Sequence, residues 1–354
     1  MQTSAPGTNP QQPPASPELQ AFSRRIDEQS LMPLWERTKR MAPGSSCVPF
    51  RWRYRDLLPR LEEAARLITA RAAERRVLVL ENPALRGTTY ITPTLYTGLQ
   101  IILPGEIAPS HRHSPSALRF MVSGEGGYTA VGGERTPMSR GDFVVTPSWA
   151  WHDHGNLGTE PVIWMDGLDT AFGEFFGALF REDHPEESHP LIRQAGDASS
   201  TFGACLFPVQ PLRSTNNPVL VYPYARSREA LDRLARQQAL DPCHGAKLKF
   251  VNPATGGAPF PTMSAFLQWV PAGFQGSPYR TTESTVFNVA EGTGAICVGD
   301  QRLDYEANDI VVVPPWAPYR IEAQTESVLF SYSDRAAQET LGFWREEPSQ
   351  ERAR

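Results

Sequence analysis

Four of the seven histidines in this chain lie in two short segments, and three of them have the spacing of metal ligands. His111 and His113 are separated by one residue, so on a β-strand both side chains point to the same face. His152 lies in the second segment, Trp151-His152-Asp153-His154, and can supply a third ligand. Three neutral imidazoles leave about three of six octahedral positions open, which gives room for a chelating substrate and a small co-substrate together.

The alternative is that these histidines only cap strands or satisfy hydrogen bonds in a core, as isolated histidines commonly do. Their concentration in two segments with regular spacing favours a metal site. The identity of the metal stays open at this point, because three imidazoles also bind Zn(II), Ni(II) or Mn(II).

The residues around the histidines resemble the two sequence motifs of a cupin barrel, in the same order and with the same spacing. The first segment reads Gly105, five residues, His111-x-His113, and later Gly124. The second reads Gly141, five residues, Pro147, and then His152, three residues, Asn156.

Two positions depart from the cupin pattern. Ala117 stands four residues after the second histidine, where cupins usually carry a glutamate, and Trp149 stands where the second motif usually has glycine. The missing glutamate matters chemically, because a site closed by a carboxylate has fewer open positions for a substrate and a co-substrate.

Composition excludes several classes of protein. The chain has 354 residues, a formal net charge of −5 and a pI near 5.9, so it offers no basic surface for nucleic acid or anionic lipid. Its cysteines are scattered without a CxxC pair, which is typical of reduced thiols: Cys47, Cys205, Cys243 and Cys297. The N-terminal residues lack a signal-peptide pattern, and no apolar run is long enough to span a bilayer. We therefore expect a cytoplasmic protein with no membrane or nucleic-acid partner.

Hydrophobic patterns change from helical to strand type along the chain. Ser16 followed by Pro17 predicts a helix start, and the spacing of leucines predicts a second helix from about Tyr54 to Arg75. Short β-type runs separated by Gly and Pro turns follow, with a further helix expected over Arg228 to Ala239.

An internal repeat shows that the chain contains two barrels. Asn82-Pro83 returns as Asn252-Pro253, and Leu99-Gln100 returns as Leu267-Gln268. The three histidine positions of the first barrel fall on Tyr279, Thr281 and Tyr319, and residues 246–354 contain no histidine. We expect one metal per chain, with the second barrel serving packing or assembly.

The predicted fold is mainly β, a bicupin with two double-stranded β-helix (jelly-roll) barrels and N-terminal and linker helices. The expected segments are a disordered N-terminus (1–16), an N-terminal helical segment (17–76), a cupin barrel with the metal site (77–170), a linker with helices (171–245), a cupin barrel without a metal site (246–335) and a C-terminal tail (336–354).

Longer stretches of sequence resemble the gentisate 1,2-dioxygenase and salicylate 1,2-dioxygenase family. They are His111-Arg112-His113-Ser114 with Arg119-Phe120, Ser139-Arg140-Gly141-Asp142 leading to Trp151-His152-Asp153-His154, and Asp166-Gly167-Leu168-Asp169. The similarity extends over about residues 17–345. The resemblance implies a non-haem Fe(II) enzyme that opens a hydroxylated aromatic acid with O₂, usually as a homotetramer.

A carboxylated substrate in an apolar pocket requires a guanidinium partner. Arg119 lies six residues after His113, an even step that places it on the same barrel face if the strand is regular. The family resemblance implies that Arg75, and possibly Arg71, approach from the end of the N-terminal helix. The alternative for each arginine is a surface ion pair.

Three further polar residues are candidates for the chemistry. His154 lies two residues from a metal ligand, so it is placed to act as an acid/base group near O₂ or the substrate hydroxyl, although it could also be a polar rim histidine. Asp166 is expected to orient His154 or an arginine, and Gln100 is expected to meet the substrate carboxylate.

The substrate itself is less closely defined by the sequence. Gly98 leaves no side chain on a strand that the resemblance places beside the substrate ring, which favours a broad substrate range. Tyr96 instead favours gentisate as the substrate. The open alternatives are gentisate, salicylate, a nitro- or halosalicylate and 1-hydroxy-2-naphthoate. Outside enzymes, bicupins also include storage and small-molecule-binding proteins, in which metal ligands are often degraded.

Overall fold

The computed structural model describes residues 16–36, 41–204, 206–209, 214 and 216–348, and the chain divides into a small N-terminal unit, Met1–Gly44, and a large unit, Ser45–Arg354. The small unit contains α1 (Pro17–Asp27) and the short 3₁₀ helix η1 (Leu34–Glu36). Ser16 caps α1 as predicted, since its hydroxyl accepts a hydrogen bond from the amide of Leu19 at 3.2 Å. Residues 1–15, expected to be disordered, lie outside the described residues.

The first barrel of the large unit is built from two facing sheets. One sheet has the strand order β12-β8-β5-β10-β3-β2 and the other has the order β11-β4-β9-β6-β7. The strands are β2 (Val77–Val79), β3 (Tyr96–Ile102), β4 (Ile107–His113), β5 (Ala117–Ser123), β6 (Gly127–Val131), β7 (Glu134–Pro137), β8 (Phe143–Thr146), β9 (His152–Asn156), β10 (Val162–Leu168), β11 (Arg181–Asp183) and β12 (Val221–Tyr222).

The second barrel repeats this plan with the sheets β1-β19-β16-β21-β14-β13 and β18-β17-β20-β15-β22. Its strands are β1 (Phe50–Trp52), β13 (Ala246–Lys249), β14 (Ser264–Val270), β15 (Tyr279–Thr281), β16 (Thr285–Glu291), β17 (Gly294–Val298), β18 (Gln301–Tyr305), β19 (Ile310–Val313), β20 (Tyr319–Ala323), β21 (Ser327–Ser333) and β22 (Glu346–Pro348).

Strand register confirms that the chain is a bicupin. Tyr279 of β15 pairs with Tyr319 of β20, just as His111 of β4 pairs with His152 of β9. The positions that the sequence repeat aligned with the histidines are therefore equivalent in the two barrels.

The expected helix from Tyr54 to Arg75 is broken in two. α2 (Tyr54–Leu67) ends where Ile68 and Thr69 adopt extended backbone conformations, and α3 (Ala70–Ala73) begins with Thr69 as its cap. The other helices are η2 (Pro83–Leu85), α4 (Thr170–Phe175), α5 (Asp197–Phe202), α6 (Tyr224–Gln237), which covers the helix expected over Arg228 to Ala239, and α7 (Arg335–Leu341). None of the helices in the described ranges is long and apolar enough to cross a bilayer.

Four edge strands come from outside the barrel segments delineated from the sequence, and one of them, β11 in the linker, pairs with β4 of the first barrel. β1, in the N-terminal segment, pairs with β19 of the second barrel. β12, in the linker, pairs with β8 of the first barrel, and β22, in the expected C-terminal tail, pairs with β15. These segments therefore complete the two barrels in addition to connecting them.

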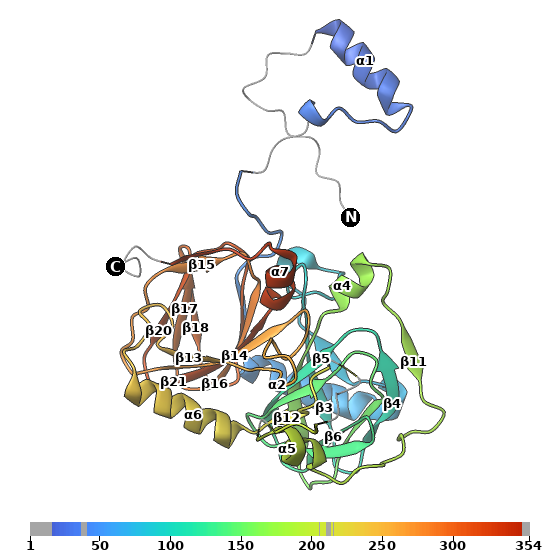
Figure 1. The fold of residues 1–354 in the computed structure, drawn as a ribbon, viewed down its shortest axis with the longest axis vertical. Coiled ribbons are helices and arrows are strands. Elements are labelled where there is room, and N and C mark those ends of the chain that lie inside the picture. Colours follow the sequence, from blue (N-terminus) through green and yellow to red (C-terminus); the bar gives the residue numbers. More distant parts are fainter. Residues whose placement is uncertain (1–15, 37–40, 205, 210–213, 215, 349–354) are drawn as a thin grey trace. The chain divides into compact units, whose positions relative to one another are not determined.

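The main core lies between the two six-stranded sheets. Phe120 of β5 and Phe330 of β21 stack with ring centroids 4.3 Å apart, and both are fully buried. The second barrel, in orange to red, lies beside the cyan to green first barrel in Figure 1. The outer faces of these sheets join the barrels, and their inner faces remain available for a site.

We predict that Phe330→Ala destabilises the protein by about 3–5 kcal/mol, because it leaves a cavity in the core that both barrels share. Phe343→Ala is the matched control, since that ring is exposed and its loss should change stability by less than about 0.5 kcal/mol. Denaturant unfolding followed by fluorescence measures both, and equal effects would contradict a shared core.

Candidate metal centre and substrate pocket

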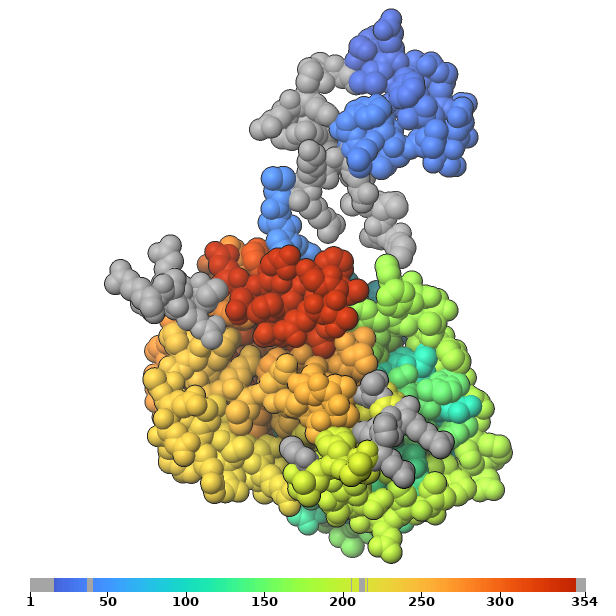
Figure 2. All heavy atoms as spheres, viewed as in Figure 1, coloured from blue at the N-terminus to red at the C-terminus, as the bar shows by residue number. Residues whose placement is uncertain are grey.

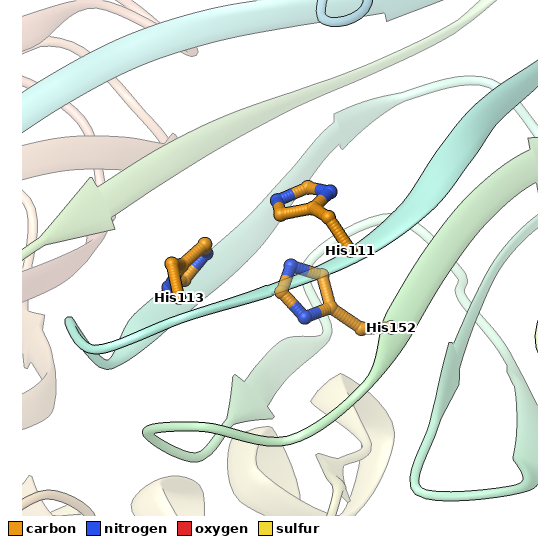
Figure 3. A group of neighbouring side chains, drawn as sticks. All are labelled: His111, His113 and His152. Atoms are coloured by element: carbon orange, nitrogen blue, oxygen red, sulfur yellow. The ribbon is translucent and has the colours of Figure 1, made fainter. Parts of the chain in front are cut away.

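Three histidine rings converge inside the first barrel. His111 and His113 come from β4, His152 comes from the neighbouring β9, and the rings face one another (Figure 3). Ring centroids are 4.4–5.3 Å apart, and one nitrogen of each ring can be chosen so that all three lie within 4.8 Å of one another. This spacing is suited to a single metal ion.

Backbone carbonyls hold the rings in the tautomer that a metal requires. Nδ1 of His113 lies 2.8 Å from the carbonyl of Pro115, and Nδ1 of His152 lies 2.9 Å from that of Ala150. Each Nδ1 therefore donates its proton outward and leaves Nε2 with a free lone pair. Nε2 of His152 is buried and has no hydrogen-bond partner among the described residues, as expected for a ligand atom.

His111 has two competing contacts at Nδ1. The carbonyl of Pro109 lies 3.2 Å away, and a guanidinium nitrogen of Arg75 lies 2.5 Å away. The carbonyl needs a protonated Nδ1 and the guanidinium needs a bare one, so Nδ1 can serve only one of them at a time.

Burial keeps all three imidazoles uncharged. It lowers the pKa of His111 to about 2, assisted by the positive charge of Arg75, and the pKa of His113 to about 4. Burial also lowers the pKa of His152 well below its usual value. Because metal binding requires neutral imidazole, the three residues fit a divalent metal at neutral pH.

The facing sheet supplies charged residues to the same interior. Gly98 of β3 pairs with Asp166 of β10, and Asp166 pairs with Arg119 of β5, so all three positions share one face. The next row inward joins Gln100 to Trp164. Arg119 does reach the interior as expected, but the chain turns between β4 and β5, so the even spacing from His113 was the wrong reason.

Arg119 and Asp166 form a buried ion pair. Nε of Arg119 lies 3.2 Å from Oδ1 of Asp166, and Nη1 donates to the hydroxyl of Thr146 at 2.6 Å. Burial raises the pKa of Asp166 to about 6, while Arg119 and a hydrogen bond from the indole N–H of Trp164 oppose that rise. Of the two expected partners of Asp166, the structure thus shows the arginine.

Arg75 enters the site from the segment after α3. Its neighbour Arg76 forms a buried ion pair with Glu106 and donates to the carbonyl of Ile68 at 2.9 Å, which anchors the backbone. Burial lowers the pKa of Arg75 to about 9, and the charge of Arg119 adds to that effect. Two guanidinium groups therefore share this interior with one carboxylate.

His154 is fully buried beside the metal ligands. Its ring lies 5.5 Å from that of His152 and 5.7 Å from that of Trp164, measured between centroids. Neither of its nitrogens has a hydrogen-bond partner within the described part of the chain, and burial lowers its pKa well below the usual value. A neutral, unpaired imidazole in this position is available to a bound molecule.

The remaining candidates differ in placement. Gln100 is buried and its amide nitrogen lacks a described partner, whereas Arg71 lies exposed on α3 and is not brought into contact with the interior residues. A β-carbon on Gly98 would lie 2.4 Å from Cγ1 of Val77 and 2.9 Å from the hydroxyl of Tyr96. Burial and the charge of Asp166 raise the pKa of Tyr96, which remains a neutral phenol.

Two interior residues were missed by sequence reasoning. Trp164 orients Asp166 and packs beside His154, and the signal was its even spacing from Asp166 on one strand. Val77 of β2 pairs with Gln100 and approaches Gly98, a long-range contact that no local pattern reveals.

The second barrel differs at the row of the ion pair. The row that corresponds to Gly98, Asp166 and Arg119 contains Phe266, Ser331 and Phe287. Two phenyl rings therefore replace a glycine and an arginine, a serine replaces the aspartate, and this row holds no ion pair.

Known proteins share this arrangement over nearly the whole chain. Residues 98–168 match the family model of the cupin domain. The chain is 47% identical to gentisate 1,2-dioxygenase 1 of Aquipseudomonas alcaligenes, over 95% of this chain and 98% of that protein. The chain belongs to the gentisate and salicylate 1,2-dioxygenase family.

Two other members of this dioxygenase family carry different substrates in their names. One is the 1-hydroxy-2-naphthoate 1,2-dioxygenase of Nocardioides sp. strain KP7, which is 33% identical over 93% of this chain and 88% of that protein. The other is the salicylate 1,2-dioxygenase of Pseudoaminobacter salicylatoxidans, whose crystal structure with gentisate has a TM-score of 0.88, 34% sequence identity and 96% coverage of each chain. The present chain is accordingly a ring-cleaving dioxygenase.

We predict one divalent metal per chain of this dioxygenase, because Tyr279, Thr281 and Tyr319 stand in the second barrel where the first barrel has its three converging histidines. His152→Ala should lose the metal while the protein stays folded, and Tyr319→Phe at the equivalent position of the second barrel should retain it. Elemental analysis of the purified variants gives the answer. A second equivalent of metal that persists in His152→Ala would contradict a single site.

Proposed function

We propose that this dioxygenase uses Fe(II) to open a hydroxylated aromatic carboxylic acid, gentisate or a salicylate, with O₂. The ring bond that breaks joins the carbon carrying the carboxylate to the carbon carrying the hydroxyl. The observation that carries the proposal is the convergence of three neutral histidines with a buried Arg119–Asp166 pair in one barrel interior.

Iron is favoured among the metals that three imidazoles bind. Oxidative ring opening requires a redox-active centre, which Zn(II) does not provide. Bound Fe(II) would hold the substrate and O₂ together and conduct electrons between them. His111, His113 and His152 are the ligands we propose, and the absence of a carboxylate at Ala117 leaves the remaining positions to the substrate and O₂.

The substrate carboxylate is proposed to bind between two arginines. Arg119 and Arg75 carry two positive charges, and Asp166 balances one of them. Apart from the metal, these side chains therefore carry a net charge near +1, which favours a negatively charged carboxylate. Arg119 is held in place by Asp166 and Thr146, so little side-chain entropy is lost on binding.

His154 is proposed to handle the proton of the substrate hydroxyl. Its ring is neutral, buried and without a partner among the described residues, so one nitrogen is free to accept that proton. Gln100 is proposed to donate its unpaired amide N–H to the substrate carboxylate. Arg71 remains a proposed substrate contact by family resemblance only, since its side chain is exposed.

A larger ring is the second candidate. Gly98 lets Val77 and Tyr96 lie close against the backbone of β3, and one relative of similar length is named for 1-hydroxy-2-naphthoate. We also propose that the enzyme is cytoplasmic and works as a homotetramer, for which the exposed rings of Phe175, Phe176 and Phe180 offer apolar contact surface.

An oxygen electrode tests the proposed function. The Fe(II)-loaded enzyme is given gentisate, salicylate, 5-nitrosalicylate and 1-hydroxy-2-naphthoate in turn, while ultraviolet absorbance follows loss of the aromatic ring. Gentisate or a salicylate should drive stoichiometric O₂ uptake. Absence of uptake with all four acids would instead support a non-catalytic bicupin.

His154→Ala should lower kcat by about 10²–10⁴-fold, because a positioned proton acceptor typically contributes that much. Metal content should stay near that of the wild type, since His154 is not among the converging ligands. Steady-state kinetics and metal analysis on the same preparation check both points. Loss of metal as complete as in His152→Ala would make His154 a ligand instead.

Gly98→Ala should abolish turnover of salicylates that lack a second hydroxyl while gentisate turnover persists. The added methyl would clash with Val77 and Tyr96, so the ring loses the freedom to shift. Without the para hydroxyl the ring donates electrons less readily. The reaction rate then depends more strongly on correct placement of the ring in the pocket.

The double variant Val77→Ala/Gly98→Ala distinguishes two causes. Recovery of salicylate turnover would assign the effect to the clash with Val77, and continued loss would assign it to the methyl filling the pocket. Unchanged salicylate turnover in Gly98→Ala alone would refute this view of the pocket.

A further inference from the structure

The outer face of the metal-binding sheet is covered by one segment of the linker. Residues that alternate with the ligands point outward: Ser110 and Arg112 on β4, and Asp153 on β9. Each of the three is contacted by residues 178–192, which we call the outer strap. Light-green residues form much of the surface of the first barrel in Figure 2, and β11 lies beside β4 in Figure 1.

The first half of the outer strap is fixed to β4. β11 pairs with it so that Arg181 lies opposite His113 and Asp183 lies opposite His111. Arg112, between the two ligands, donates to the carboxylate of Glu182 at 2.6 and 2.9 Å. Its guanidinium also lies over the rings of Trp149 and Trp151, at 4.4 and 4.6 Å from their centroids. Trp149 has a φ of 62°, and these contacts hold it at the position where cupins usually have glycine.

The second half of the outer strap crosses a break in the hydrogen-bond ladder between β4 and β9, the two strands that carry the three histidines. Ala108 pairs with His154 and His111 pairs with His152, so one extra residue bulges from β4 between those pairs. The backbone of Ser110 within this bulge bonds to the strap instead of β9: its amide donates to the carbonyl of Glu187 at 2.7 Å, and its carbonyl accepts from the amide of His184 at 3.0 Å.

His189 ties the bulge to β9. Its Nδ1 lies 2.9 Å from Oδ2 of Asp153 and 3.3 Å from the hydroxyl of Ser110. Its Nε2 accepts a hydrogen bond from the amide of Gly133 at 3.1 Å, so the ring proton is on Nδ1 and is donated to Asp153. His189 and Asp153 are both almost completely buried, and Asp153 lies between His152 and His154 in the sequence.

We propose that His189 is a positioning residue of the metal centre. Through its bond to Asp153, His189 connects β9 to the bulge of β4 and so fixes the orientation of the His152 side chain relative to that of His111. The reason is geometric: the backbone ladder is interrupted between the two ligand pairs, and a short strand such as β9 does not by itself set the spacing of its side chains within the tolerance of a metal site. The proposal rests on the proposed metal function of the three histidines.

Three substitutions of His189 separate the ring's bond to Asp153 from its bond to Gly133, while the backbone amide of residue 189, which also donates to Oδ2 of Asp153 at 3.2 Å, is kept in all three. His189→Ala removes both ring bonds. His189→Asn places an amide N–H where Nδ1 was and restores the side-chain bond to Asp153, whereas His189→Gln reaches toward Gly133 and leaves Asp153 without its side-chain donor. Glu186→Ala is the matched control, because Glu186 is an exposed residue of the same strap.

Co(II) titration of the metal-free protein, followed by visible absorption, measures the affinity and geometry of the site without turnover. We expect affinity about 10–100-fold weaker in His189→Ala and His189→Gln, with an altered Co(II) spectrum, and values near the wild type in His189→Asn and Glu186→Ala. Wild-type affinity and spectrum in His189→Ala would overturn the proposal.

If His189→Ala fails to fold, the comparison between His189→Asn and His189→Gln decides, and equal affinities in those two variants would overturn the proposal. A wild-type protein that binds no Co(II) would contradict the metal site itself, so the two failures are distinguishable.

Discussion

The site depends on keeping three imidazoles uncharged and aimed at one point inside a barrel. Burial supplies the first condition, since it lowers the pKa of each ring far below neutral. Backbone carbonyls two residues away supply the second for His113 and His152, because they fix the tautomer without using another side chain. The same burial gives every additional charge in this interior a high free-energy cost. That cost limits which other charged residues the pocket can hold.

Charge balance explains which polar residues surround the histidines. Burial of Arg119 in the interior is offset by the nearby charge of Asp166 and by the hydrogen bond that it donates to Thr146, and Asp166 is in turn held by the indole of Trp164. Arg75 has no ion-pair partner among the described residues, so the side chains of the pocket leave one positive charge, besides that of a bound metal, for a substrate acid. In the second barrel phenyl rings replace the glycine and arginine, so apolar side chains occupy the equivalent positions of the same scaffold.

Spacing along single strands made much of the site predictable. The ligand triad, the two barrels and the loss of the histidines from the second barrel follow from period-two geometry and an internal repeat, which are local properties of the sequence. The break between α2 and α3 was not predicted, because leucine spacing continues past Leu67 while the backbone turns at Ile68. Arg119 lies in the barrel interior although the chain turns between β4 and β5, so the even step from His113 does not account for its placement.

Contacts between distant segments were beyond sequence reasoning. The link from His189 to Asp153 joins residues 36 positions apart, and nothing in either segment alone indicates the other. The same is true of Val77 and Gly98, which meet because β2 pairs with β3. The exposure of Arg71 also required the structure, since its position near the helix end equally suits a residue that turns inward.

The central claim is that three histidines and no carboxylate leave room for the substrate and O₂ on one metal. Electron paramagnetic resonance of the Fe(II) enzyme with nitric oxide, a stand-in for O₂, tests it directly when the substrate carries ¹⁷O in its carboxylate or in its hydroxyl. The account predicts a nitric oxide signal that each label broadens, because both oxygens are bound beside it. A signal that the substrate abolishes, or that neither label broadens, would contradict the account.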